Sequence, residues 1–297
     1  MTIQSRPLSS SLSPLSTQAT EAVHQSGTIV PRRVSASLTY LQPTTDKPFT
    51  YMFEPPPGIP ERSGKFQSYD VEITDGRSAG TDFTLDQHGF ALTRQMTTVT
   101  NFFSETEIRD IYYPETAQLI TQITGAGKVV IFDHTCRFAS ALQQQQAVPR
   151  EPVLRVHNDY TTRSGPQRVR DLLPAAEAEE RLQRRFAIIN VWRPIRGPLV
   201  HLPLAICDAR SVTAGDLVAA DLIYRDRIGE TYAVNHSPRH RWFYFPRMQQ
   251  DEEILIKSFD SDENVARFTP HTAFVDPTEP DPALLRQSIE IRALVFF

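Results

Sequence analysis

The chain has 297 residues, is 40% hydrophobic and carries a formal net charge of −4, so it can bury a core but has no basic excess to bind nucleic-acid phosphates. No apolar run approaches the ~18 residues of a membrane span, and no signal-peptide core precedes the body of the chain. Residues 1–33 are rich in Ser, Thr, Gln and Pro, and we expect them to form a disordered leader of a cytoplasmic protein.

The Pro-rich stretch 41–64 follows this leader and contains aromatic residues at intervals. Proline interrupts helices and central strands, so the stretch is expected to be irregular. We expect a loop whose aromatic side chains pack against the rest of the domain. The alternative is a lid or a dimer arm.

Two regions carry helical signals. Ser104 and Glu107 form a capping-box pattern, and apolar residues follow at helical spacing. Pro114 is expected to kink or divide this helix, and Gly125 is expected to end it. A second helical region is predicted at 167–185, where charges lie at i,i+4 spacing on an exposed face.

The remainder is rich in short β-branched and aromatic segments bounded by Pro, Gly, Asp or Asn, which is typical of strands. Ten such segments and one helical interruption predict a mainly β, jelly-roll-like barrel or sandwich with flanking helices. We expect a single domain over 34–297 with its core at about 128–297. The predicted strands are 129–132, 152–156, 187–192, 204–207, 217–224, 231–234, 242–245, 254–259, 272–275 and 289–297.

His157 and Asp159 are the most informative polar pair. Two residues apart on a strand, they point to the same face. Inside a barrel, they would bring an imidazole and a carboxylate to one point. That is two-thirds of a 2-His-1-carboxylate site, which binds a metal and leaves coordination positions open. The pair alone is a weak signal, because surface His–Asp pairs are common.

His271 opens a later predicted strand and could supply the third ligand. Arg286 and Ser288 alternate onto one face of the last strand. An arginine inside a barrel is costly unless it meets an anion. A guanidinium beside a hydroxyl is suited to hold a carboxylate.

His236 and His240 are the alternative to His271 as third ligand, because their spacing suits a helical metal site. Pro238 lies between them and strand-like residues follow, which argues against a helix there. Together with His157, they would instead suggest a zinc-dependent hydrolase on a jelly roll.

An H-x-D pair, a distant His and R-x-S about one hairpin later resemble the Fe(II)/2-oxoglutarate-dependent oxygenases. Five blocks are similar to the fungal and bacterial hydroxylase/desaturase group that includes the cephamycin methoxylase small subunit, and among its members to fungal meroterpenoid endoperoxygenases of the novofumigatonin type. The similarity covers about 35–297. The blocks are 190–195, 203–208, 241–246, 257–261 and 286–293.

The resemblance implies a double-stranded β-helix (cupin-like) core in which His157, Asp159 and His271 hold Fe(II). It implies that Arg286 and Ser288 hold the distal carboxylate of 2-oxoglutarate, with O2 as the other cosubstrate. The implied reaction is hydrogen abstraction from a terpenoid-like intermediate of secondary metabolism, ending in hydroxylation, desaturation or endoperoxide formation. The implied partner is a small molecule, without nucleic acid or membrane, and a homodimer is the candidate assembly. A non-catalytic binding subunit of a biosynthetic complex is the other alternative.

Further residues are candidates for the pocket. Trp192 and Arg193 end an apolar strand. Both could contact the cosubstrate or the substrate. Alternatively, Trp192 is a core residue and Arg193 is paired with Asp208. Arg292 lies on the face of Arg286 and either shares the cosubstrate carboxylate or pairs with an acid such as Glu253. The remaining pocket candidates, although strand aromatics are more often core, are Tyr224, Trp242, Tyr244 and His134.

Overall fold

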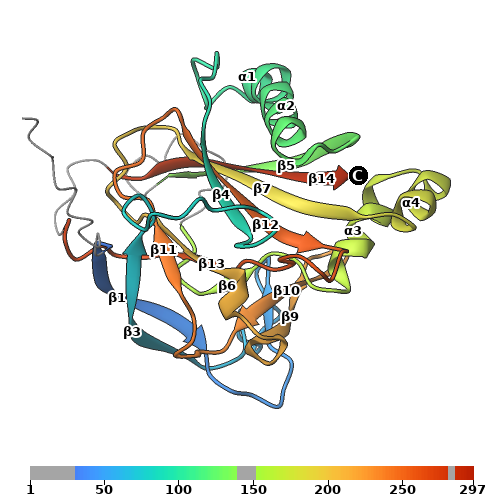
Figure 1. The fold of residues 1–297 in the computed structure, drawn as a ribbon. Helices are drawn as coiled ribbons and strands as arrows, with labels where there is room; N and C mark the ends of the chain where they lie inside the picture. Colours follow the sequence, from blue (N-terminus) through green and yellow to red (C-terminus); the bar gives the residue numbers. More distant parts are fainter. Residues whose placement is uncertain (1–30, 139–151, 280–284) are drawn as a thin grey trace, which may run out of the picture.

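The computed structural model describes residues 31–138, 152–279 and 285–297, and every structural statement below concerns these residues. Two curled β-sheets face each other and helices lie on the outside (Figure 1). The mainly β, jelly-roll-like architecture expected from the sequence is confirmed. The expected disordered leader was 1–33. Residues 1–30 of it lie outside the described residues, and the first strand begins at Arg33.

The larger sheet has nine strands among the described residues and forms the lower half of the molecule in Figure 1. Its strand pairs are antiparallel except for β3–β11 and β2–β9. In spatial order the strands are β1 (Arg33–Leu41), β3 (Phe66–Asp75), β11 (Trp242–Tyr244), β8 (Leu204–Cys207), β13 (His271–Ala273), β6 (His157–Asn158), β10 (Ile228–Val234), β9 (Leu217–Ile223) and β2 (Phe49–Tyr51).

The smaller sheet has five antiparallel strands in the described part of the chain. All nine residues of its central strand β7 are buried, because helices cover one face of the sheet and the larger sheet lies on the other. In spatial order the strands are β4 (Phe90–Arg94), β12 (Glu252–Asp260), β7 (Phe186–Pro194), β14 (Gln287–Phe296) and β5 (Lys128–Phe138).

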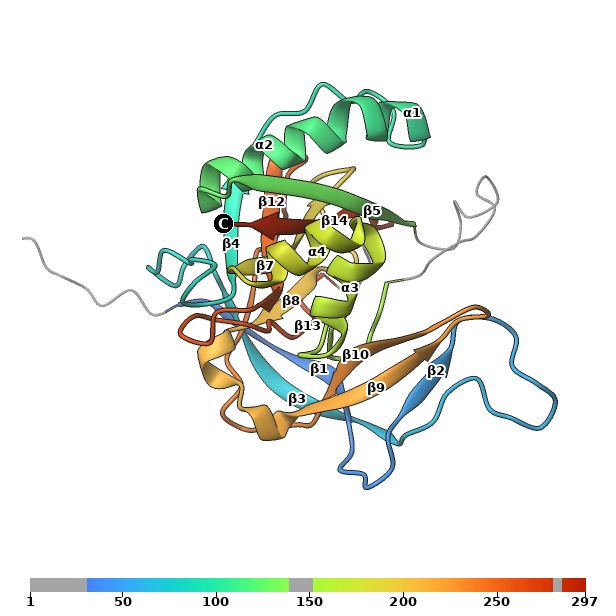
Figure 2. The same ribbon diagram turned by 90° about the vertical axis from the view of Figure 1, so that its right-hand side faces the viewer.

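The first helical region covers the outer face of the smaller sheet, above β5 and β14 in Figure 2. The Ser104 hydroxyl caps it by accepting from the backbone N–H of Glu107 at 3.3 Å, and Gly125 ends it with φ 70°. The helix is not broken at Pro114: a π-helical turn precedes this residue and accommodates the missing N–H and the bulky ring. Its segments are α1 (Glu105–Glu107), the π turn (Ile108–Tyr112) and α2 (Tyr113–Thr124).

The second helical region is split in two at Pro174. Val169 and Ala178 are buried against the ends of β7 and β14, so these helices close the space between the two sheets at one side, as Figure 2 shows. The helices are α3 (Ser164–Leu172) and α4 (Ala175–Leu182), and two 3-10 turns follow at Ala209–Ser211 and Ala214–Asp216.

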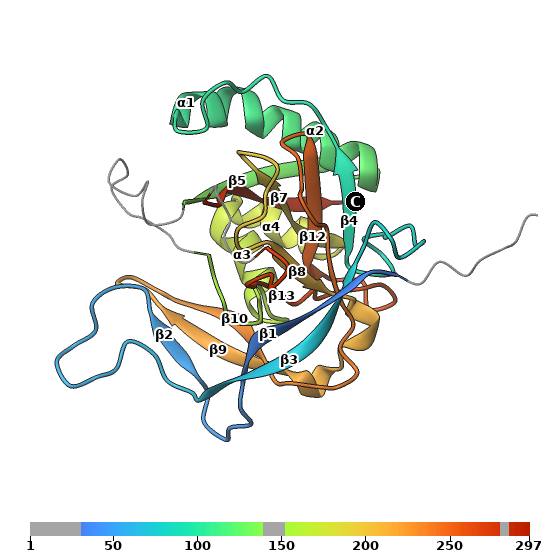
Figure 3. The same ribbon diagram turned by 90° about the vertical axis from the view of Figure 1, so that its left-hand side faces the viewer.

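The first third of the chain joins the sheets, which the sequence analysis did not predict. Strands β1 and β3 pair along their whole length and extend the larger sheet through β11, on the side that faces the viewer in Figure 3. Strand β4 pairs with β12 in the smaller sheet, and β2, in the Pro-rich stretch, pairs with β9. Within the parts that the structure describes, no helix combines the length and apolar character needed to cross a bilayer.

Candidate active site

The segment around β6 carries the first two predicted metal ligands. Burial alternates along it: Val156 and Asn158 are buried in the body, whereas Arg155, His157 and Asp159 are partly exposed toward a cavity. Alternate side chains of an extended chain point to opposite faces, so these last three share one face.

Asn158 fixes this segment relative to the third predicted ligand. Its side-chain amide donates to the carbonyl oxygens of Tyr160 (2.7 Å) and Ser258 (2.9 Å), and its carbonyl oxygen accepts from the backbone N–H of Thr269 at 2.9 Å. Thr269 lies two residues before His271. One buried amide therefore ties the two ligand-bearing segments together.

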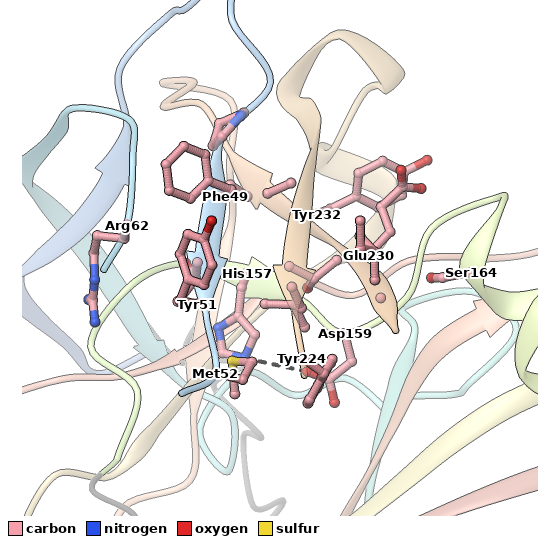
Figure 4. Close-up of a pocket in the computed structure, with 18 of the residues that line it drawn as sticks. Phe49, Tyr51, Met52, Arg62, His157, Asp159, Ser164, Tyr224, Glu230 and Tyr232 are labelled. Atoms are coloured by element: carbon pink, nitrogen blue, oxygen red, sulfur yellow. Dashed lines mark ion pairs between the residues drawn. The ribbon is translucent and has the colours of Figure 1, made fainter. Parts of the chain in front are cut away.

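The structure brings His157, Asp159 and His271 together. His157 and His271 are directly opposite each other in β6 and β13, with ring centroids 4.6 Å apart. One potential ligand atom from each of the three side chains lies within 4.8 Å of the others. His157 Nε2 is 3.6 Å from Asp159 Oδ1 (dashed line in Figure 4).

Both imidazoles are held in an orientation that suits metal binding. His157 Nδ1 lies 2.8 Å from the Arg155 carbonyl oxygen, and His271 Nδ1 lies 2.9 Å from that of Thr269. An N–H at each Nδ1 donates to these oxygens, which leaves each Nε2 as the free lone pair. Burial and the neighbouring His271 lower the pKa of His157 to about 4, so it is neutral near pH 7, the form that binds metals.

The Asp159 carboxylate is clamped from the smaller sheet. Its Oδ2 accepts from Asn190 Nδ2 at 2.8 Å and from Arg292 Nε at 3.0 Å, so Oδ1 is the oxygen that faces His157. Burial alone would raise the pKa of this carboxyl, but Arg292 and the two histidines hold it well below its usual range. Two imidazoles and one ionised carboxylate are the donors of a 2-His-1-carboxylate iron site, so the residues fit Fe(II).

The alternative ligands lie elsewhere. His236 stacks on Tyr69 with ring centroids 4.0 Å apart, and His240 faces Asp216 at 3.5 Å. Neither belongs to the His157 cluster, which is the sole group of three or more potential ligands found among the described residues. The structure therefore does not support the zinc-hydrolase alternative.

Arg286 is a buried cation directly before β14, with 3% of its surface exposed. Its Nε donates to Ser288 Oγ at 3.0 Å, its Nη1 donates to the Leu202 carbonyl oxygen at 2.8 Å, and its guanidinium lies 5.0 Å from the Trp192 ring centre. No described carboxylate forms an ion pair with it, and burial, together with Arg137, lowers its pKa to about 9. A buried guanidinium without a counter-ion indicates an anion site.

Comparisons with known proteins agree with this geometry. A family model described as "Oxidoreductase/YMDC permease-like domain" matches residues 38–296. The hydroxylase/desaturase efuI of Hormonema carpetanum is 33% identical over 257 residues, 78% of this chain and 85% of the relative. The alpha-ketoglutarate-dependent dioxygenase phiK of a fungal species is 35% identical over 239 residues, 76% of this chain and 83% of the relative.

The chain belongs to the Fe(II)/2-oxoglutarate-dependent hydroxylase/desaturase family. A solved structure of the iron and alpha-ketoglutarate-dependent endoperoxidase NvfI superimposes with a TM-score of 0.80 at 26% identity, covering 89% of this chain and 98% of that one. As a member of this family, the chain is a dioxygenase that uses Fe(II), 2-oxoglutarate and O2.

A cavity of about 1330 Å³ opens onto His157 and Asp159 in this dioxygenase. Strands β9 and β10 form one wall, and the Pro-rich stretch forms another through residues 48–55 and 61–63. The aromatic side chains of Phe49 and Tyr51 lie above His157 in Figure 4. The stretch is therefore more than a loop packed on the body, because it shapes the cavity.

Arg193 does not serve the dioxygenase site, so the prediction of a cosubstrate role is wrong. It lies on the opposite face of β7 from Asn190, and its Nη1 pairs with Glu253 Oε1 at 3.1 Å. Its Nη2 donates to the carbonyl oxygens of Gln95 and Gln250 at 2.7 Å each. The alternative partner, Asp208, is instead paired with two other arginines.

Two predicted pocket aromatics are core residues instead. Trp242 Nε1 donates to the Tyr40 hydroxyl at 2.7 Å, and Tyr244 packs edge-on against Phe274 with ring centroids 5.4 Å apart. Both rings are buried in one apolar cluster of the larger sheet, and neither lines the cavity. Their prediction as pocket residues is therefore wrong.

The other three pocket candidates have different outcomes. His134 lies on the helix-facing side of β5, where its Nδ1 is 2.9 Å from the Tyr113 hydroxyl, so this prediction is wrong. Trp192 does not line the cavity but lies against the guanidinium of Arg286. Tyr224 lines the cavity, and its role as a substrate-pocket residue stays a prediction.

The clamp on Asp159 was missed. The sequence analysis offered an acid such as Glu253 as a partner of Arg292, but its acidic partners are Asp159, Asp133 at 3.2 Å through Nη1, and Glu290 at 2.7 Å through Nη2. Asn190 also donates to Glu290, at 3.1 Å. The signal was present in the sequence: these are polar residues inside otherwise apolar strands, and a buried polar group needs partners.

Proposed function

We propose that this dioxygenase binds Fe(II) through His157, Asp159 and His271, and holds the distal carboxylate of 2-oxoglutarate with Arg286 and Ser288. A small molecule of secondary metabolism is oxidised in the adjoining cavity. The observation that carries the proposal is the convergence of three suitable donors near a buried guanidinium that has no described counter-ion.

The iron, when bound, supplies activation of O2 and oxidation of the substrate, coupled to conversion of 2-oxoglutarate to succinate and CO2. The chain's own residues bind and orient. Asn190 and Arg292 keep Asp159 ionised and turned so that one oxygen faces the histidines. Arg286 offers its guanidinium and Ser288 its hydroxyl to a carboxylate. The Trp192 ring packs against this guanidinium in a cation–π contact.

We further propose a terpenoid-like substrate and an outcome of hydroxylation, desaturation or endoperoxide formation. The cavity volume of about 1330 Å³ exceeds the ~300–1,000 Å³ of ordinary small-molecule pockets, which suits a multi-ring skeleton. The relatives' names include both hydroxylase/desaturases and an endoperoxidase. A cytoplasmic location and a homodimer stay predictions from the sequence, and gel filtration with light scattering would test the second.

Anaerobic reconstitution of the purified chain with Fe(II) and 2-oxoglutarate tests the assignment. We expect a weak visible charge-transfer band from the chelate. His157→Ala is expected to lose both iron and band, whereas the matched control His236→Ala, outside the cluster, keeps both. Arg286→Gln is expected to keep iron but to need far more 2-oxoglutarate, with a smaller effect for Ser288→Ala.

Two results would contradict the proposal: full iron content and turnover in His157→Ala, or an unchanged 2-oxoglutarate titration in Arg286→Gln. Succinate release by the purified chain, dependent on O2, distinguishes an enzyme from a non-catalytic binding subunit. The complete donor set favours the enzyme, because a binding subunit has no need of it.

A further inference from the structure

Most charged side chains on the cavity wall have partners. Glu230 is paired with Lys47 at 2.7 Å and also faces Arg163 at 3.7 Å. Arg62 is paired with its neighbour Glu61. These groups are neutralised locally and do not require a charged ligand.

Arg155 is different. It is half-buried in the cavity wall, and in the described ranges its guanidinium makes no hydrogen bond and no ion pair. Its side chain lies over the Phe66 ring, 5.5 Å from the ring centre. Burial lowers the pKa of Arg155; Arg62 lowers it further and Glu61 raises it, and because these two neighbours are paired with each other, neither is a counter-ion of its own for Arg155. A half-buried guanidinium that lies over an aromatic face and has no counter-ion of its own is stabilised by an anion that enters the cavity.

Arg155 is held at a defined place relative to the proposed metal centre. It precedes His157 by two residues on the same face of the strand, which corresponds to a separation of about 7 Å along the chain. Its carbonyl oxygen accepts from His157 Nδ1, and its backbone bridges to Thr39 of β1, which also accepts from Val156 N–H at 2.9 Å.

Part of the nearby wall is aromatic. Phe49, Tyr51 and Phe53 form an edge-to-face ladder with ring centroids 5.7 and 5.4 Å apart, and Tyr232 lies across the cavity from them (Figure 4). Such a wall buries apolar carbon and offers few hydrogen bonds. Beside these aromatic rings, Arg155 is a half-buried cation that forms no ion pair with any described residue.

We propose that the substrate is an apolar ring or chain skeleton bearing a carboxylate, and that Arg155 binds this carboxylate while the apolar part packs against the aromatic ladder. The inference rests on the proposed function, because it takes the cavity at His157 as the substrate site. Arg155 is distinct from the proposed cosubstrate clamp, since Arg286 is buried with Ser288 on the other sheet.

Calorimetric titration of the Fe(II)–2-oxoglutarate form under anaerobic conditions tests this, with two matched pairs of probes. The pairs are dehydroabietic acid with its methyl ester, and decanoic acid with methyl decanoate. We expect at least one acid to bind about tenfold or more tightly than its ester, the size of a charge-assisted hydrogen bond. Arg155→Gln is expected to abolish this preference and Arg155→Lys to keep part of it. Arg227→Gln, an exposed cavity arginine stacked on Tyr224, is expected to keep all of it.

The proposal is overturned if neither acid binds the unmodified protein, if acid and ester bind alike, or if the preference survives in Arg155→Gln. The charge-transfer band separates this result from the proposed function. A band unchanged in Arg155→Gln shows that the cosubstrate site is intact, and loss of the band there would assign Arg155 to 2-oxoglutarate and overturn the inference. Absence of the band in the unmodified protein would count against the proposed function, whereas the acid preference would still report on Arg155.

Discussion

Replacing Arg292 tests how the proposed metal-binding carboxylate is held. The guanidinium donates to Asp159 Oδ2 at 3.0 Å, to Glu290 Oε2 at 2.7 Å and to the Thr135 hydroxyl at 3.1 Å. A hydrogen bond to a charged group contributes about 1.5–3 kcal/mol. Loss of a group that orients a ligand costs about 10–100-fold in metal affinity, which is the same range. We therefore expect Arg292→Gln to weaken Fe(II) binding by that factor.

The single variant also leaves Glu290 buried without its cation. Breaking a buried pair costs about 3–5 kcal/mol of folding stability. It adds net negative charge near the metal as well, which favours cation binding and offsets part of the loss. The double variant Arg292→Gln/Glu290→Gln conserves charge. We expect it to regain most of the stability but not the metal affinity.

Competition titration against a chromophoric chelator under anaerobic conditions measures the affinity, and urea unfolding measures the stability. Asn190→Ala provides a comparison that leaves the net charge unchanged, since it removes one hydrogen bond to the ionised Asp159, about 1.5–3 kcal/mol, and should weaken binding about tenfold or more. If the charge-conserving double variant bound Fe(II) as tightly as the unmodified chain, Arg292 would have no part in orienting Asp159, and the reasoning would be refuted.

Three further predictions concern stability and metal. Gly89→Ala should destabilise the fold and weaken Fe(II) binding, because Gly89 has φ 85° and an added Cβ would collide with Thr269, whose carbonyl orients His271; thermal unfolding and metal titration measure this. Glu252→Gln should cost about 2–3 kcal/mol near pH 7. Burial would raise the pKa of Glu252, but hydrogen bonds from Arg77 and a backbone N–H bring it below the ordinary 4.5, so the difference from the unmodified chain should shrink as pH falls below about 4.5 in urea unfolding. Fe(II) at 100 times its dissociation constant should add about 2.7 kcal/mol of stability, reversed by a chelator.

The strands after residue 128 could be predicted because their signal is local. They are short, apolar and bounded by turn residues, and β8 begins and ends where the pattern placed it. The strand β1 carried a signal too, since Val34, Ala36, Leu38 and Tyr40 alternate with exposed residues. Its serines and threonines made it look like a continuation of the polar leader. Strand β2 has three residues and no local signal, because its pairing with β9 creates it.

The proposed ligands could be found because side-chain alternation and motif order constrain them. The face of a doubly buried strand is a different matter. Every residue of β7 is buried, so neither hydropathy nor alternation tells which of Asn190 and Arg193 faces the metal ligands. The direction of each side chain follows from its partner. Asn190 donates a hydrogen bond to Asp159, and Arg193 forms an ion pair with Glu253 on the opposite face of the sheet. Such pairings join residues more than 30 positions apart, and no local pattern encodes them.

The candidate metal centre and the wall of the cavity are built from different parts of the two sheets. His157 and His271 belong to the larger sheet, whereas Arg286 and the clamp on Asp159 belong to the smaller one. The centre is thus fixed by contacts between the sheets. The wall of the adjoining cavity, which we propose to be the substrate site, is built separately, by residues 48–55, 61–63 and 66 and by strands β9 and β10 at the far edge of the larger sheet. Changes in that wall can move the substrate without disturbing the donors, and the position of the substrate decides the product.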